Sequence, residues 1–132
     1  MPLASFHSTQ GPYLEAIIEI NGVLLTVMDE FSVDARNIPN IGAEFDFEFN
    51  TLLDDNESWE SIFAGNPDQK IGIVNLAGWQ YRAYGKITSI NPVVVDCGLL
   101  AVEDVIQTSD PRVVGEFVAF TIDRLGGYGH AI

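Results

Sequence analysis

The sequence predicts an all-β protein, mainly β with one short helix, arranged as a small antiparallel β-barrel. The first observation is the aromatic content: eight Phe, four Tyr and two Trp, which pack well on a pleated sheet. The second is a set of turn dipeptides, foremost Asn21-Gly22 and Asn91-Pro92, that divide the apolar runs. The third is residues 43–50, where apolar and acidic side chains alternate, a pattern that fits a strand and does not fit a helix.

The N-terminal part predicts a lead-in followed by a hairpin. Residues 1–12 are small and polar and end in Gly11-Pro12, so we expect a loose segment. Tyr13–Ile20 and Val23–Met28 are apolar runs on either side of Asn21-Gly22. Both central positions of a type I′ turn need positive φ, which Asn-Gly readily adopts. The two runs therefore predict a hairpin.

A loop and a two-faced strand are expected next. Asp29–Gly42 has no sustained period and predicts a loop of about a dozen residues, longer than most connections in a compact domain. Such a loop is either a partner surface or a flap over a barrel end. The strand Ala43–Asn50 follows, with Phe45, Phe47 and Phe49 on one face and Glu44, Asp46 and Glu48 on the other. The rings predict core, and the carboxylates predict an outer face.

One short helix is expected before Gly65. Its body is Glu57–Ala64, with Asp54 or Asp55 as the N-cap and Gly65 as the terminator. A helix of this length is marginal alone and depends on docking against the rest of the protein.

The chain is organised around Trp79 to Leu125. Strands are expected at Trp79–Ile90, Val93–Val102 and Gly115–Asp123, after a shorter one at Lys70–Leu76. These elements predict one barrel domain over residues 13–125 with an OB-like layout, followed by a flexible Gly-rich tail at 126–132. Since Lys70–Leu76 is short and apolar, it is a candidate edge strand, and a homodimer is one way to cover it.

The charge of the chain is high and uneven. The net charge is −13. Residues 1–70 hold 13 acidic and 2 basic side chains, a net charge of −11, and residues 71–132 hold 6 and 4, a net charge of −2. A field of this sign repels phosphate backbones and attracts a basic protein or a cation. The acidic surface is therefore either a docking feature or a means of staying in solution.

The carboxylates of Glu44, Asp46 and Glu48 are candidates for binding. Alternate residues on a strand lie about 6–7 Å apart, and a calcium site needs six to eight oxygen ligands. Asp54 and Asp55 contribute only if the chain folds back. We therefore expect no metal site and interpret these five residues as either a solvated face or a docking face for a basic partner.

A second candidate surface combines aromatic and basic side chains: Trp79, Arg82, Tyr84 and Lys86. Alternation places the last three on one face of a strand. A platform of this kind binds a ligand or stacks the bases of a single-stranded oligonucleotide, although the overall charge opposes nucleic acid.

The sequence contains no catalytic motif. Cys97 is the single cysteine and lies in an apolar run, which is typical of a small buried hydrophobe in a reducing compartment. His7 and His130 lie near opposite ends, which predicts no zinc site. Asp96 either faces water or pairs across strands, and supports an enzyme only if it shares a cleft with another acid.

The leading hypothesis is a cytoplasmic, non-enzymatic protein-binding module for a basic partner, of an inhibitor, immunity or adaptor type. The alternative is a ligand- or oligonucleotide-binding OB-like barrel. No cofactor or metal is expected. No membrane partner is expected either, because no apolar run approaches the ~20 residues of a membrane span.

Overall fold

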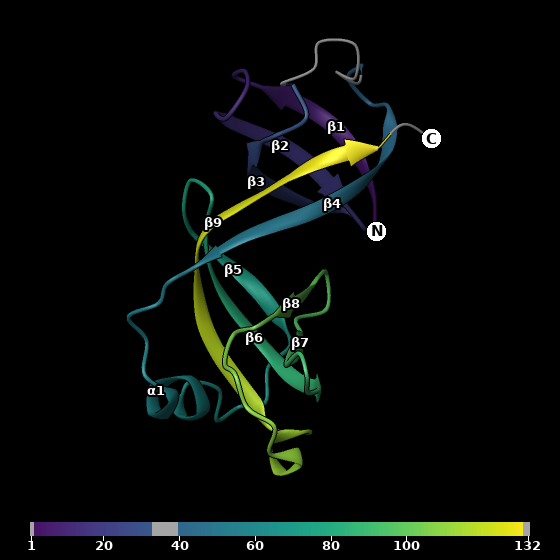
Figure 1. Cartoon of the computed structure of the whole chain (residues 1–132). Coiled ribbons are helices and arrows are strands. Elements are labelled where there is room, and N and C mark those ends of the chain that lie inside the picture. Colours follow the sequence, from purple (N-terminus) through teal and green to yellow (C-terminus); the bar gives the residue numbers. More distant parts are fainter. Residues whose placement is uncertain (1, 33–39, 131–132) are drawn as a thin grey trace. The chain divides into compact units, whose positions relative to one another are not determined.

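The structure is a computed structural model that describes residues 2–32 and 40–130. Figure 1 shows a mainly β protein with one short α-helix, as the sequence predicts. The strands are β1 (Leu3–Thr9), β2 (Glu15–Ile20), β3 (Val23–Asp29), β4 (Glu44–Leu53), β5 (Gly72–Ala77), β6 (Gln80–Ser89), β7 (Val94–Asp96), β8 (Ala101–Glu103) and β9 (Phe117–His130). The helix is α1 (Trp59–Ala64), and η2 (Pro111–Val113) is a single 3₁₀ turn.

The strands pair in the order β3-β2-β1-β4-β9-β6-β7-β8, and β5 pairs β6. The β1–β2, β1–β4, β2–β3, β6–β7, β6–β9 and β7–β8 pairs are antiparallel. In addition, β9 pairs β3 in parallel, with Gly126 opposite Met28. The predicted antiparallel sheet is therefore confirmed.

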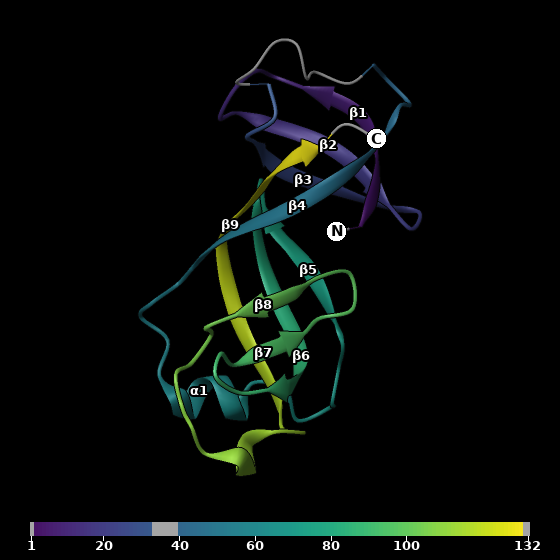
Figure 2. The ribbon, with the colours of Figure 1, turned by 45° about the vertical axis from the view of Figure 1, so that its right-hand side comes forward.

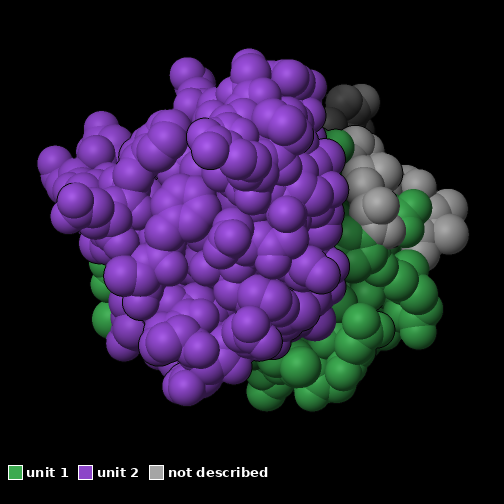
Figure 3. Space-filling view, turned by 90° about the horizontal axis from the view of Figure 1, so that it is seen from below, with its two compact units in different colours: residues 1–52, 77–80, 124–132 green, residues 53–76, 81–123 purple. Residues whose placement is uncertain are grey.

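The chain divides into two compact units (Figure 3). Unit 1 comprises residues 1–52, 77–80 and 124–132, and unit 2 comprises residues 53–76 and 81–123. Neither unit is continuous in the sequence, because β9 supplies its first half to unit 2 and its second half to unit 1.

Unit 1 begins with a strand in the segment that was expected to be loose. β1 pairs both β2 and β4, and it buries Ala4 and Phe6. The predicted hairpin is present between β2 and β3, with Asn21 at φ 52° and Gly22 at φ 79°. These positive angles are those a type I′ turn requires.

The Phe-rich core of unit 1 confirms the predicted alternation of β4. Phe45 and Phe47 are buried and Phe49 is half-buried, whereas Glu44 is exposed. The ring centroids of Phe45 and Phe47 are 6.0 Å apart, and those of Phe47 and Phe49 are 5.0 Å apart. These edge-to-face contacts add to the stabilisation from burial.

The segment from Gly126 onward, expected to be a flexible tail, continues strand β9 to His130. A Cβ at Gly127 would lie 2.3 Å from the carbonyl oxygen of Glu48, and one at Gly129 would lie 2.5 Å from the ring of Phe45. Glycine is needed here because the β4 rings and backbone lie directly against β9. The glycines at positions 127 and 129 therefore allow β9 to lie close to β4, in a segment that was expected to be a tail.

In unit 2 the helix begins two residues later than predicted, at Trp59 in place of Glu57. Its N-cap is Ser58, whose hydroxyl accepts a hydrogen bond from the amide of Ser61 at 3.2 Å, in place of the expected Asp54 or Asp55. Gly65 ends the helix but keeps a right-handed φ of −76°. Glycine fits at this position because a Cβ there would lie 2.9 Å from the Cβ of Ala119.

The apolar run Val93–Val102, predicted as one strand, is folded into the short hairpin of β7 and β8 (Figure 2). Gly98 turns the chain at φ 86°. Gly85 of β6 admits β7, since a Cβ there would lie 2.4 Å from the carbonyl oxygen of Asp96. Within the described residues, no helix is long and apolar enough to cross a membrane.

Candidate functional site

The outer face of strands β4, β1, β2 and β3 in unit 1 carries acidic and apolar side chains together. These four strands are consecutive in the sheet. Alternation along each strand buries one set of side chains, such as Ala4, Phe6 and Ile18, and turns the other set outward. The exposed large apolar residues of the outward set include Leu3, Ile17 and Leu24, which are 47%, 38% and 59% accessible.

The strand register aligns these outward residues in rows. Glu44 of β4 lies opposite Ser5 of β1, which lies opposite Glu19 of β2, which lies opposite Leu24 of β3. Neighbouring strands are about 4.8 Å apart, so the Cα atoms of Glu44 and Glu19 are separated by roughly 10 Å. The small Ser5 between them leaves room for a side chain that contacts both carboxylates.

Adjacent rows repeat this mixture of acidic and apolar side chains. Asp46 lies opposite Leu3, and Ile17 lies opposite Thr26. We call the whole set the acidic face, and it consists of Leu3, Glu15, Ile17, Glu19, Leu24, Glu44, Asp46 and Glu48.

The charge of unit 1 is strongly one-sided. Its described acidic residues are Glu15, Glu19, Asp29, Glu30, Glu44, Asp46 and Glu48, and its described basic residue is Arg124. Carboxylates spaced across a sheet without interleaved cations produce a negative potential over that surface.

Of the predicted acidic residues, Glu44, Asp46 and Glu48 share this face, and Asp54 and Asp55 belong to unit 2. The carboxylate of Asp54 accepts a hydrogen bond from the amide of Asn56 at 2.9 Å, which shapes the turn before α1. Among residues 2–32 and 40–130, no group of three or more His, Cys, Asp and Glu is placed to hold a metal ion.

The alternative surface is divided and largely engaged within the protein. Trp79 belongs to unit 1, and Arg82, Tyr84 and Lys86 alternate along β6 in unit 2. The guanidinium of Arg82 forms an ion pair with Glu57 at 2.8 Å and donates to the hydroxyl of Thr121 at 3.1 Å. A cation held this way is not free to bind a phosphate backbone.

The other two residues of that surface also have internal contacts. The ammonium of Lys70 lies 5.3 Å from the ring centroid of Tyr84, and that of Lys86 lies 5.8 Å from the ring centroid of Phe117. Such cation–π contacts cover faces on which bases would otherwise stack.

The surroundings of Cys97 and Asp96 indicate structural roles for both residues. Burial, followed by the charge of Asp96, raises the pKa of the Cys97 thiol to about 12. The thiol therefore stays protonated near neutral pH and is a poor nucleophile. Asp96 is exposed opposite Lys86, and its carboxylate accepts a hydrogen bond from the amide of Gly98 at 2.9 Å.

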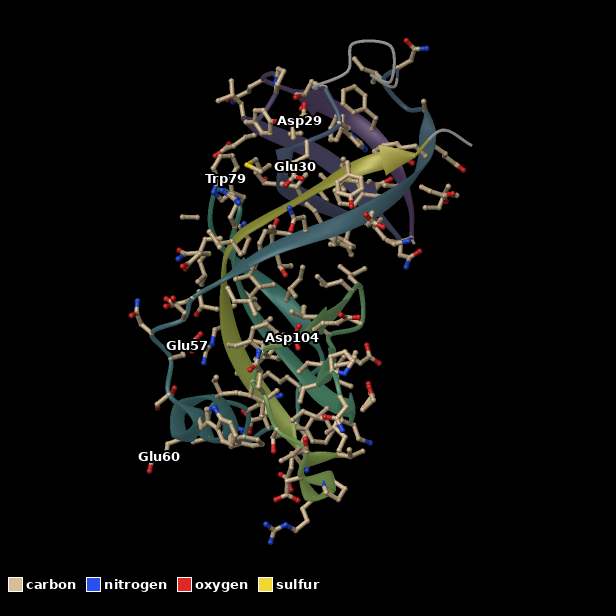
Figure 4. The ribbon with its side chains drawn as sticks, in the orientation of Figure 1. Asp29, Glu30, Glu57, Glu60, Trp79 and Asp104 are labelled. Carbon is tan, nitrogen blue, oxygen red and sulfur yellow. The ribbon has the colours of Figure 1, made fainter. Side chains whose placement is uncertain are left out.

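One residue that sequence reasoning missed is Asp29, labelled with Glu30 in Figure 4. Its side chain is fully buried, yet both carboxylate oxygens are satisfied. One accepts hydrogen bonds from the amides of Phe31 and Ser32 at 2.8 and 2.7 Å, and the other from the hydroxyls of Thr9 and Ser32. The signal available in the sequence was Asp followed three residues later by Ser, a pattern that stabilises turns.

Comparison with protein-family models, with curated proteins and with solved structures finds no match for this chain.

Proposed function

We propose that unit 1 is an OB-like five-stranded barrel whose acidic face docks a basic protein. The order of pairing supports the barrel: β3, β2, β1, β4 and β9 follow one another, and β9 pairs β3 again. An OB-like barrel has five strands in a closed or nearly closed sheet.

The observation that carries the docking function is the row of Glu44, Ser5, Glu19 and Leu24 across four adjacent strands. Carboxylates steer a basic partner to the surface and set its orientation. Exposed apolar side chains between them supply the area that is buried on contact.

The partner fitted to this face presents Lys or Arg side chains around apolar groups. When the acidic face covers a cationic surface of the partner, that surface can no longer bind its own ligand. The negative charge of the acidic face therefore favours an inhibitor of a basic protein. An adaptor that holds such a partner uses the same contacts.

The test compares two triple variants that remove the same number of charges. Glu19→Gln, Glu44→Gln and Asp46→Asn alter the acidic face, and Glu60→Gln, Glu103→Gln and Glu116→Gln alter exposed positions in unit 2. A basic protein is first isolated on the wild-type chain at about 50 mM salt and purified, and its affinity for each variant is then measured by calorimetry.

We expect the acidic-face variant to lose about tenfold or more in affinity and the unit 2 variant to lose about twofold or less. Equal losses would mean that the partner responds to net charge alone. An unchanged affinity for the acidic-face variant at low salt, or the retention of no basic protein, would overturn the proposal.

A further inference from the structure

A cleft of about 460 Å³ lies in unit 2, and none of the residues that line it belongs to the acidic face. Two loops form it: the turn that follows β6 and the loop that follows β8. It is lined by Asn91, Pro92, Val93, Asp104, Gln107, Thr108 and Ser109. This volume is within the usual range for small-ligand sites.

The lining of this cleft has one formal charge, the carboxylate of Asp104 (Figure 4). Within the described residues, this carboxylate accepts no hydrogen bond and forms no ion pair. The lining includes no Lys, Arg or aromatic side chain. A phosphate or another anion therefore finds no counter-charge, and a planar aromatic ligand finds no ring to stack on.

Beside Asp104, the hydroxyl oxygen of Ser109 can accept a hydrogen bond from a ligand. The hydroxyl of Ser109 donates to the side-chain oxygen of Asn91 at 3.2 Å, which leaves the lone pairs of Ser109 available. The amide of Asp104 is used, since it donates to the carbonyl of Val93 at 2.9 Å. Pro92 has no N–H to offer, so a cationic ligand that donates hydrogen bonds to Asp104 and Ser109 can lie against its ring.

We propose that this cleft binds an alkylammonium or alkylguanidinium group. The cationic head would meet the carboxylate of Asp104 and the oxygen of Ser109, and the aliphatic stem would lie against Pro92. Charge-assisted hydrogen bonds of this kind are about twice as strong as neutral ones. The group comes either from a Lys or Arg side chain of a protein or from a free polyamine.

The test is a titration of the isotope-labelled full chain, followed by NMR, with butylguanidinium and with its neutral isostere butylurea. Asp104→Asn removes the charge. Asn tolerates the positive φ of 60° at this position, and the spectrum itself reports whether the variant is folded. Glu103→Gln is the matched control, because Glu103 is the exposed neighbouring residue and does not line the cleft.

We expect saturable shifts at Asn91, Asp104 and Ser109 with butylguanidinium, about tenfold weaker binding to Asp104→Asn, and unchanged binding to Glu103→Gln. Ser109→Ala should weaken binding by a smaller factor. Equal shifts with butylurea, equal binding to Asp104→Asn, or non-saturating shifts across the whole surface would overturn the proposal.

Parallel titrations with acetyl-arginine-amide and with spermidine separate the two sources of the cation. Tighter binding of the first supports a protein side chain, and tighter binding of the second supports a free polyamine. Binding of neither overturns the site. Because the probes are small and the cleft belongs to unit 2, this result is independent of whether the acidic face docks a protein.

Discussion

The hydroxyl of Thr9 donates a hydrogen bond to the buried carboxylate of Asp29 and thereby joins the end of β1 to the end of β3. Thr9 is also an acceptor, since its hydroxyl oxygen receives the amide of Gly11 at 3.0 Å. The backbone of Asp29 takes part as well, because its carbonyl accepts the amide of Tyr13 at 2.7 Å. Asp29 thus connects β1, β3 and the turn before β2 through its side chain and its backbone together.

Asp29→Asn should lower the free energy of unfolding by about 2–3 kcal/mol, because an amide offers one oxygen to donors that now share two. Urea denaturation followed by tryptophan fluorescence measures this change. Glu30→Gln is the control, since among the described residues the Glu30 carboxylate accepts a surface hydrogen bond from Asn50 at 3.0 Å, and its effect should be much smaller. Equal stability of the two variants would show that the buried network contributes little.

The ion pair of Glu57 and Arg82 should contribute more to the free energy of unfolding than an exposed ion pair does. Their side chains are 14% and 24% exposed, and the second oxygen of Glu57 accepts the backbone amide of Thr121. Arg82→Met should therefore destabilise unit 2 by about 1–2 kcal/mol, because it leaves a partly buried carboxylate without its cation. The exposed pair of Arg112 and Asp110 is the comparison, and Arg112→Met should leave the unfolding midpoint in urea unchanged.

Leu24→Ser separates the two contributions to docking on the acidic face. Leu24 is 59% exposed, so the fold should tolerate the change. We expect a faster dissociation of the basic partner with an unchanged salt dependence of association, because apolar contact acts after encounter. Glu19→Gln should instead slow association and weaken its salt dependence. Identical kinetic effects of the two variants, measured by surface plasmon resonance, would argue against this division of roles.

Gly127→Ala should be strongly destabilising, by about 3 kcal/mol or more, because the new Cβ meets the backbone oxygen of Glu48 at 2.3 Å. Gly126→Ala should cost less, since its nearest obstacle at 2.9 Å is the flexible end of Glu30. Thermal unfolding of the two single variants tests this order. The reverse order would mean that β9 does not lie against β4 at Gly127.

The sequence pattern was sufficient to predict structure where a feature depends only on the residues of one strand or one turn. The alternation of residues 44–49 predicts which rings are buried, and Asn21-Gly22 predicts the hairpin. The sequence pattern failed where packing against an element distant in the sequence determines the local structure. Gly127 and Gly129 predict a loose tail when only the local sequence is considered, but the rings of Phe47 and Phe45 lie against them.

The acidic face was likewise only partly predictable. Glu44, Asp46 and Glu48 are evident from one strand, but their alignment with Glu19 and Leu24 depends on the register of β1 and β2. Register between strands far apart in sequence is set by tertiary packing. The aromatic–basic surface shows the same limit, because Glu57, the partner of Arg82, lies 25 residues before it.

The thiol of Cys97 predicts a loss of stability at high pH. Its pKa is about 12 in the folded chain against 9.0 for the ordinary thiol. Between these values the unfolded chain releases a proton that the folded chain keeps, so the free energy of unfolding falls as pH rises through this range. Cys97→Ala removes that contribution, so the free energy of unfolding of the wild type should fall more steeply than that of the variant above pH 9.0. Parallel curves from urea titrations would contradict the burial of the thiol, as would rapid alkylation of the folded chain at neutral pH.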